Sequence, residues 1–305
     1  MSISVKNISK SYKTLKAVNN ISFEVGDGEL FGLIGPDGAG KTTLFRILTT
    51  LLIADEGVAT VSGYDVEKDY KAIRNSVGYM PGRFSLYQDL TIEENLEFFA
   101  TIFGTTIEEN YDLIKDIYIQ IEPFKNRRAG KLSGGMKQKL ALCCALIHKP
   151  KVLFLDEPTT GVDPVSRKEF WEMLKRLKQK GITILVSTPY MDEAALCDRI
   201  ALIQEGKILE IDTPQNIVAN HQKNIFNVSS SDTYKLLQDL KSYPTSFSVY
   251  AFGEFIHYTD SNPNFNPEDL KEYLIQNNHS DIIIQPTEAT IEDVFMDLAI
   301  SSKSN

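Results

Sequence analysis

The chain reads Gly35-Pro36-Asp37-Gly38-Ala39-Gly40-Lys41-Thr42 between an apolar run, residues 30–34, and a helical pattern, residues 41–52. This segment matches G-x-x-x-x-G-K-[ST], in which backbone N–H groups surround the phosphates of a nucleotide. A strand, a glycine-rich loop and a helix in this order are the context that such a phosphate loop requires. A chance glycine-rich turn is the alternative, and the flanking patterns count against it.

The residues of this loop have separate predicted roles. Lys41 would pair with the β- and γ-phosphates, and the Thr42 hydroxyl would ligate Mg²⁺. The helix that follows adds its N-terminal dipole to the anion site, so we count Thr43 among the binding residues. Because the sequence has no Asn-Lys-x-Asp segment, a guanine-specific GTPase is disfavoured.

A pair of carboxylates follows a second apolar run, in Val152-Leu153-Phe154-Leu155-Asp156-Glu157. Strand ends in an open α/β sheet point into the crevice that binds the ligand. We therefore expect Asp156 to hold Mg²⁺ and Glu157 to polarise a water aimed at the γ-phosphate. Read alone, Asp-Glu at a strand end is often a helix cap, but the phosphate loop in the same chain favours the catalytic role.

The wider pattern predicts an α/β fold with a mainly parallel sheet. Apolar runs near residues 152–155, 182–186 and 200–203 alternate with helical patterns such as residues 165–179. A dense apolar face is predicted for the helix after residue 92, from Leu96, Phe98, Phe99, Ile102 and Phe103. The composition changes near Pro214, and the short strand and helix patterns that follow predict a second, small α+β domain.

Charge and composition exclude some classes of function. The net charge is −9, and residues 220–305 have twelve acidic residues against five lysines and no arginine. Nucleic-acid binding needs clustered basic charge, so we expect no nucleic acid partner. No apolar run approaches the roughly 20 residues that span a bilayer. The three cysteines, Cys143, Cys144 and Cys197, have no metal-ligand spacing and fit buried thiols in a reducing compartment.

A second motif points to a family. Residues 132–139 read Leu132-Ser133-Gly134-Gly135-Met136-Lys137-Gln138-Lys139 and resemble the signature motif of ABC-type ATPases. The resemblance implies a P-loop ABC-type domain over residues 1–218, with a mainly parallel sheet, an antiparallel β-subdomain and a helical subdomain at about residues 84–150. Residues 219–305 would form the accessory domain. Ser133, Gly134 and Gly135 would then bind the ATP held by a partner subunit.

Further positions carry the same resemblance. Tyr12 is similar to the aromatic residue that stacks on adenine in this family, although a tyrosine there could be an ordinary surface residue. Residues 160–163 resemble the D-loop, which crosses the dimer interface. Residues 286–287 and 291–295 resemble the ending of ATP-binding subunits of drug, antibiotic or polysaccharide exporters. This ending implies a separate membrane permease and a cytoplasmic location, peripheral on the inner face of the cell membrane.

Two positions depart from the family pattern. Gly82 stands where the family has the Q-loop glutamine, and Pro189 stands where it has the H-loop histidine. Both missing side chains act at the γ-phosphate, so we expect ATP binding with slow hydrolysis in this chain's own pocket. A heterodimer with a second ATP-binding subunit is then favoured over a homodimer. Arg83 could replace part of the lost charge, or it could simply be solvated.

Two other classes of function remain open from the sequence. One is a non-transport regulatory ATPase of the ABC type, and the other is a soluble phosphotransferase, which the signature motif disfavours. The accessory domain could stabilise packing or a dimer, or it could select a partner.

Overall fold

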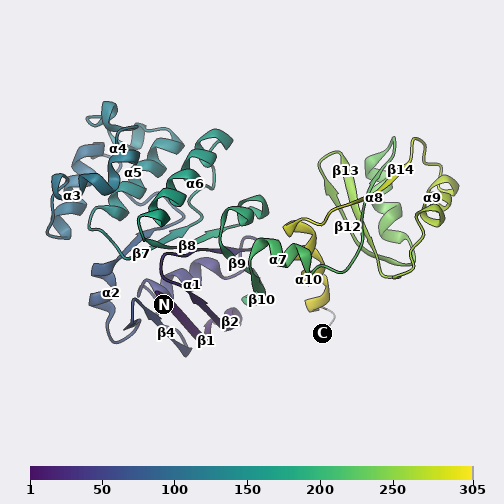
Figure 1. The fold of residues 1–305 in the computed structure, drawn as a ribbon, viewed down its shortest axis with the longest axis horizontal. Coiled ribbons are helices and arrows are strands. Elements are labelled where there is room, and N and C mark those ends of the chain that lie inside the picture. Colours follow the sequence, from purple (N-terminus) through teal and green to yellow (C-terminus); the bar gives the residue numbers. More distant parts are fainter. Residues whose placement is uncertain (304–305) are drawn as a thin grey trace. The chain divides into compact units, whose positions relative to one another are not determined.

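The computed structural model describes residues 1–303, which divide into two compact units. The first unit is Met1–Thr213 and the second begins at Pro214 (Figure 1). Within the described residues no helix is long and apolar enough to cross a membrane.

The first unit is organised by a six-stranded sheet of order β10-β9-β3-β8-β7-β6. All neighbours pair in parallel except β10, which runs antiparallel to β9. Every residue of β3, β7 and β8 is buried, as expected for strands covered on both faces. The predicted fold class is confirmed. The strands are β3 (Leu30–Ile34), β6 (Val77–Met80), β7 (Val152–Asp156), β8 (Thr183–Thr188), β9 (Arg199–Gln204) and β10 (Lys207–Asp212).

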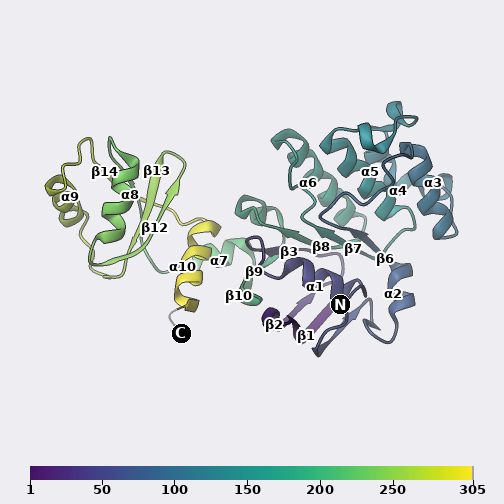
Figure 2. The same ribbon diagram turned by 180° about the vertical axis from the view of Figure 1, so that it is seen from behind.

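A second, antiparallel sheet of order β2-β1-β4-β5 completes the core of this unit. In both ribbon views α1 (Lys41–Leu48) lies between the two sheets (Figures 1 and 2), and one cluster of buried side chains joins all three. The Phe23 and Phe31 rings stack at 5.4 Å, and Phe45 meets Phe154 edge to face at 6.0 Å. The strands are β1 (Ile3–Tyr12), β2 (Leu15–Val25), β4 (Glu56–Val61) and β5 (Tyr64–Asp65).

Helices cover the other side of the six-stranded sheet (Figure 1). Residues 84–150 contain α3, α4 and α5, and α3 begins with a capping box between Thr91 and Glu94. The predicted apolar face of α3 is only partly buried, because Phe98 and Ile102 are 36% and 58% exposed. The helices on this side are α3 (Ile92–Ile102), α4 (Tyr111–Tyr118), α5 (Gly134–Leu146) and α6 (Pro164–Gln179), whereas α2 (Tyr70–Ser76) contributes Ile73 to the buried cluster that contains α1.

One local prediction, the end of α1, needs correction, and another, the buried cysteines, is confirmed. The helix after the phosphate loop ends at Leu48, not at residue 52, because Thr50 adopts a φ of 63° that a helix cannot continue through. The three cysteines are buried and free, as predicted. Burial raises the pKa of each thiol, which makes these cysteines unreactive.

The second unit contains an antiparallel sheet of order β12-β13-β11-β14. One face of the sheet packs against α8 and α9 through a cluster that includes Val228, Leu236, Ile256 and Leu270. The elements are α7 (Pro214–Ala219), β11 (Ile225–Ser229), α8 (Thr233–Ser242), β12 (Ser246–Phe252), β13 (Phe255–Asp260), α9 (Pro267–Gln276), β14 (Ile283–Thr287) and α10 (Ile291–Lys303).

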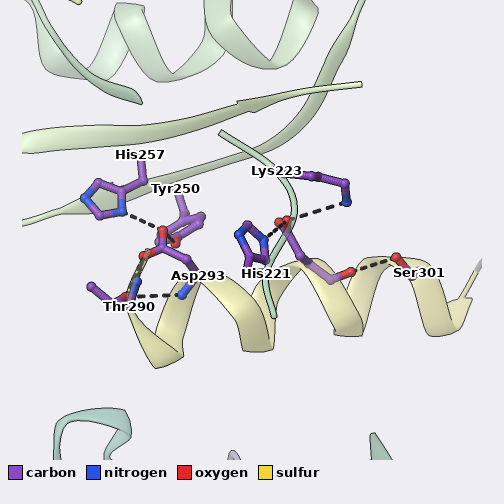
Figure 3. A network of polar contacts seen from close by, with 8 residues as sticks. His221, Lys223, Tyr250, His257, Thr290, Asp293 and Ser301 are labelled. Atoms are coloured by element: carbon purple, nitrogen blue, oxygen red, sulfur yellow. Dashed lines mark hydrogen bonds and ion pairs between the residues drawn. The ribbon is translucent and has the colours of Figure 1, made fainter. Parts of the chain in front are cut away.

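Buried polar contacts fix α10 to the rest of this unit (Figure 3). Asp293 accepts hydrogen bonds from the Tyr250 hydroxyl, from His257 Nδ1 at 2.6 Å and from the Thr290 hydroxyl at 2.5 Å. Burial alone would raise the pKa of Asp293, but the hydrogen bonds from Thr290, Tyr250 and His257 hold it below its usual value. One turn further on, Asp297 lies 2.8 Å from His221 Nε2.

The Asp293 carboxylate should contribute to the stability of the second unit in a pH-dependent way. Because its pKa is lowered by folding, its contribution is present above an ordinary carboxylate pKa of about 4 and is lost as the pH falls below that value. Asp293→Asn should destabilise the unit by about 2 kcal/mol at pH 7, measured by hydrogen exchange in β13. Glu288→Gln, at an exposed site, is the control. Equal stability of the two variants would contradict the role of Asp293.

Candidate nucleotide site

The glycine-rich loop is shaped by close contacts with two neighbouring strands. Gly40 has a φ of 104°, and a Cβ there would lie 2.2 Å from the carbonyl oxygen of Ala17 in β2. A Cβ on Gly35 would lie 2.1 Å from the carbonyl oxygen of Ile203 in β9. Only glycine fits at both positions. The loop leads into α1, whose first turn has no side-chain cap, so its backbone N–H groups are available to an anion.

Lys41 occupies the centre of this loop and is 3% exposed. Its Nζ donates to the carbonyl oxygens of Gly35 at 2.7 Å and Pro36 at 2.9 Å. It also forms an ion pair with Glu157 Oε1 at 3.1 Å. A buried ammonium group is costly unless it is paired, and these three oxygens provide the pairing. Phosphate oxygens could take over these contacts when a nucleotide binds.

The carboxylates at the end of β7 meet the same loop. The Ser187 hydroxyl donates to Asp156 Oδ1 at 2.7 Å, and the Glu157 N–H donates to the carbonyl oxygen of Ser187 at 3.1 Å. Burial, together with the negative charge of Asp156, raises the pKa of Tyr79 to about 12. Glu157 has a φ of 51°, a conformation that is uncommon outside glycine and often found at functional sites.

Gly82 and Pro189 adjoin the strand ends that carry the site. A Cβ on Gly82 would lie 3.1 Å from the carbonyl oxygen of Asp156 and 3.8 Å from the Glu157 Cβ. Pro189 follows Thr188, the last residue of β8, whose carbonyl oxygen accepts a hydrogen bond from the Gly35 N–H at 3.2 Å. Neither glycine nor proline has a side-chain group that can donate or accept a hydrogen bond.

The residues present fit a magnesium–nucleotide complex. The uncapped start of α1 and Lys41 suit the phosphates, and the Thr42 hydroxyl and Asp156 supply oxygen ligands. Mg²⁺ is usually held by one or two protein oxygens together with substrate phosphates and water. The donor set therefore suits Mg²⁺ bound with ATP rather than a dedicated protein cage.

The remaining predicted site residues fall in two other places. Tyr12 is 42% exposed at the end of β1 and pairs in register with Leu15, close in sequence to the Ala17 carbonyl that touches the loop. Ser133 caps α5 and accepts from the Met136 N–H at 3.3 Å. Cβ atoms on Gly134 and Gly135 would lie 3.6 Å from Gly161 O and 2.7 Å from Ser166 Oγ, so this segment packs against residues 160–166.

Sequence reasoning missed three side chains around the site. Ser187 orients Asp156, Tyr79 lies near that carboxylate, and Glu193 accepts hydrogen bonds at the ends of β7 and β8. The polar pair Ser187-Thr188 at the end of an apolar run was the available signal for the first of these.

Known proteins with similar sequences identify the family. Residues 18–160 match the family model described as ABC transporter. The Nod factor export ATP-binding protein I of Rhizobium sp. (strain N33) is 33% identical over 302 residues, which cover 98% of this chain and 97% of that protein. The chain belongs to the ABC transporter ATP-binding family. ABC-family domains of this kind bind ATP, typically with Mg²⁺, and generally hydrolyse it.

Other ABC proteins match about seven tenths of this chain. The probable multidrug ABC transporter ATP-binding protein YbhF of Escherichia coli (strain K12) is 40% identical over 219 residues, or 71% of this chain. The chain spans only 38% of that protein's length. A solved structure of an ATP-binding subunit of an ABC transporter aligns with a TM-score of 0.66 and 28% identity over 72% of this chain and 92% of its own.

Removing the Lys41 ammonium should abolish most of the affinity for nucleotide. Lys41→Ala deletes a buried positive charge at the centre of the loop, and it removes the ion-pair partner of Glu157. We expect MgATPγS binding, measured by calorimetry, to weaken by at least about tenfold, the effect of one charged hydrogen bond of roughly 1.4–3 kcal/mol. Lys68→Ala, at an exposed site, should bind like the wild type. Equal affinity of both variants would contradict this site.

Proposed function

We propose that this chain is the ATP-binding subunit of an ABC-type exporter, peripheral on the cytoplasmic face of the cell membrane, with a permease on a separate chain. The observation that supports it most is the convergence of Lys41 and Glu157 at 3.1 Å, with Asp156 beside them. The printed names of the relatives, which refer to multidrug transport and Nod factor export, favour an export role. The nucleotide chemistry belongs to the domain predicted at residues 1–218, with an accessory domain predicted at residues 219–305; the two compact units divide slightly earlier, between Thr213 and Pro214.

The residues divide the chemistry of hydrolysis among them. Lys41 and the loop N–H groups bind the phosphates, and Mg²⁺ held by Thr42 and Asp156 would neutralise charge on them. Glu157 accepts a proton from the water that attacks the γ-phosphate. In the structure Glu157 is paired with Lys41, and phosphates that attract Lys41 would free this carboxylate to act as a base. ATP binding would therefore itself free Glu157 to act as the base.

We further propose that hydrolysis in this pocket is slow. Gly82 lies beside the backbone of Asp156 and Pro189 directly follows the last residue of β8, and neither has a side-chain donor for the γ-phosphate or the water. Losing one positioned donor commonly costs about 10²–10³ in rate. ATP binding should persist, because Lys41, Thr42, Asp156 and the loop N–H groups remain. Ser133, Gly134 and Gly135 complete the pocket of a second ATP-binding subunit, so a heterodimer is favoured.

Restoring the two family side chains tests this proposal. The pure chain should hydrolyse MgATP slowly, and Glu157→Gln should abolish what remains. A double variant with Gly82→Gln and Pro189→His should turn over faster by about tenfold or more, because two positioned groups are restored. A turnover by the wild-type chain that matches competent family members, or no gain in the double variant with ATP affinity unchanged, would contradict the slow-site proposal.

A groove on the first unit supports a permease partner. It has a volume of about 310 Å³, and its lining includes Leu51, Tyr79, Phe99, Phe103 and His148. Two apolar side chains in this region are largely exposed. Leu51, which lines the groove, is 57% exposed, and Ile102, on the same helix as Phe99, is 58% exposed. The groove also reaches Met80 and Pro81, directly before Gly82. An apolar cytoplasmic segment of the permease would therefore bind next to the carboxylate pair.

Charge introduced into the groove should release the permease. Leu51→Asp should prevent co-extraction of a membrane-spanning protein with this chain while MgATP binding stays within twofold of wild type. Ile53→Asp, which is 65% exposed and outside the groove lining, is the matched control. A wild-type chain that fractionates with ribosomes, or without any membrane protein, would favour the regulatory alternative instead.

A further inference from the structure

Glu193 is a buried carboxylate that the nucleotide chemistry does not use. It lies in η4 (Met191–Leu196), just after β8, and is 1% exposed. Its Oε1 accepts from the Thr159 hydroxyl at 2.7 Å, and its Oε2 accepts from the Thr188 hydroxyl at 2.5 Å. Arg167 Nε lies 3.6 Å from Oε1, within ion-pair distance. These three partners offset the cost of burying the charge.

The partners of Glu193 belong to three different parts of the nucleotide site. Thr188 ends β8, directly after the Ser187 that donates to Asp156. Thr159 lies two residues after Glu157 and directly before residues 160–163, and it is 1% exposed. Arg167 is in the first turn of α6, and its guanidinium packs over the Tyr190 ring at 4.1 Å. One carboxylate thus joins the ends of β7 and β8 to the start of α6.

Residues 160–163 are held by backbone hydrogen bonds to Glu157 and Thr159. The Thr160 N–H donates to the carbonyl oxygen of Glu157 and the Val162 N–H to that of Thr159, both at 3.2 Å. The loop then rests against Ser133–Gly135, since a Cβ on Gly134 would lie 3.6 Å from the carbonyl oxygen of Gly161. A shift of the Thr159 side chain would therefore move the loop against both Glu157 and the signature segment.

We propose that Glu193 is a positioning residue, which holds residues 160–163 in register with Glu157 through Thr159 and with the end of β8 through Thr188. This inference rests on the proposed ATPase function, because the loop affects catalysis only if the site binds ATP. Glu193 acts through Thr159 and Thr188 and has no chemical role of its own in the reaction. Through Thr159, Glu193 sets the distance between Glu157, the base of this pocket, and Ser133–Gly135, the signature segment that serves the partner's pocket.

The test compares two substitutions of Thr159 in the full-length chain. Thr159→Val keeps the shape of the side chain and removes the hydroxyl that donates to Glu193, whereas Thr159→Ser keeps that hydroxyl. Single-turnover hydrolysis with the protein in excess resolves rates even in a slow site. Thr159→Val should lower the maximal rate by at least about tenfold, with the half-saturating ATP concentration changed less than twofold. Thr159→Ser should keep at least half of the wild-type rate.

Two further readouts separate positioning from simple stability. Hydrogen exchange of residues 161–163, measured without nucleotide, should be faster in Thr159→Val than in Thr159→Ser. Glu193→Gln combined with Thr159→Val should be no slower in hydrolysis than the slower single variant, because both act through one contact. Additive losses, or equal rates and equal exchange in the valine and serine variants, would overturn the inference.

The outcomes also distinguish this inference from the proposed function. Failure of the wild-type chain to bind MgATPγS would overturn the proposed function, and the exchange comparison without nucleotide would still test the Glu193–Thr159 contact. Normal binding together with an unchanged maximal rate in Thr159→Val would overturn the positioning role alone.

Discussion

The ion pair between Lys41 and Glu157 is the interaction on which the nucleotide site depends. It joins the first turn of α1 to the end of β7 at 3.1 Å and sits beneath a loop whose carbonyl oxygens also accept from the lysine. The loop keeps this shape because β2 and β9 leave no room for a side chain at Gly40 or Gly35. The parallel sheet brings both groups to its carboxyl edge, where open α/β sheets bind ligands.

Around this pair the chain holds its acidic groups with hydroxyl donors from neighbouring strands. Ser187 donates to Asp156, and Thr159 and Thr188 donate to Glu193. Each contact joins residues that lie at or shortly after the ends of β7 and β8. Neither Gly82 nor Pro189 belongs to these contacts, so the proposed effect of both residues on hydrolysis does not require a looser pocket.

The sequence allowed the parts of the site that depend on local order to be predicted. The run from Leu30 through Thr42 contains its own strand, loop and helix, and the structure has all three. Contacts between distant residues could not be predicted, such as Glu193 with Thr159, which lie 34 positions apart. The apolar pattern of α3 was recognised, but periodicity does not say what covers a face, and Phe98 and Ile102 proved exposed. In the second unit the Asp293 contacts with His257 and Tyr250 depend on strand register in the same way.

A crystal structure of the full chain with MgATPγS would test the central claim most directly. The account predicts that Lys41 Nζ leaves Glu157 and the carbonyl oxygens of Gly35 and Pro36, and contacts the β- and γ-phosphates. Glu157 should then face the γ-phosphate, with Thr42 and Asp156 at the metal. A nucleotide bound elsewhere, or a Lys41–Glu157 ion pair that stays intact with phosphates in the loop, would contradict the account.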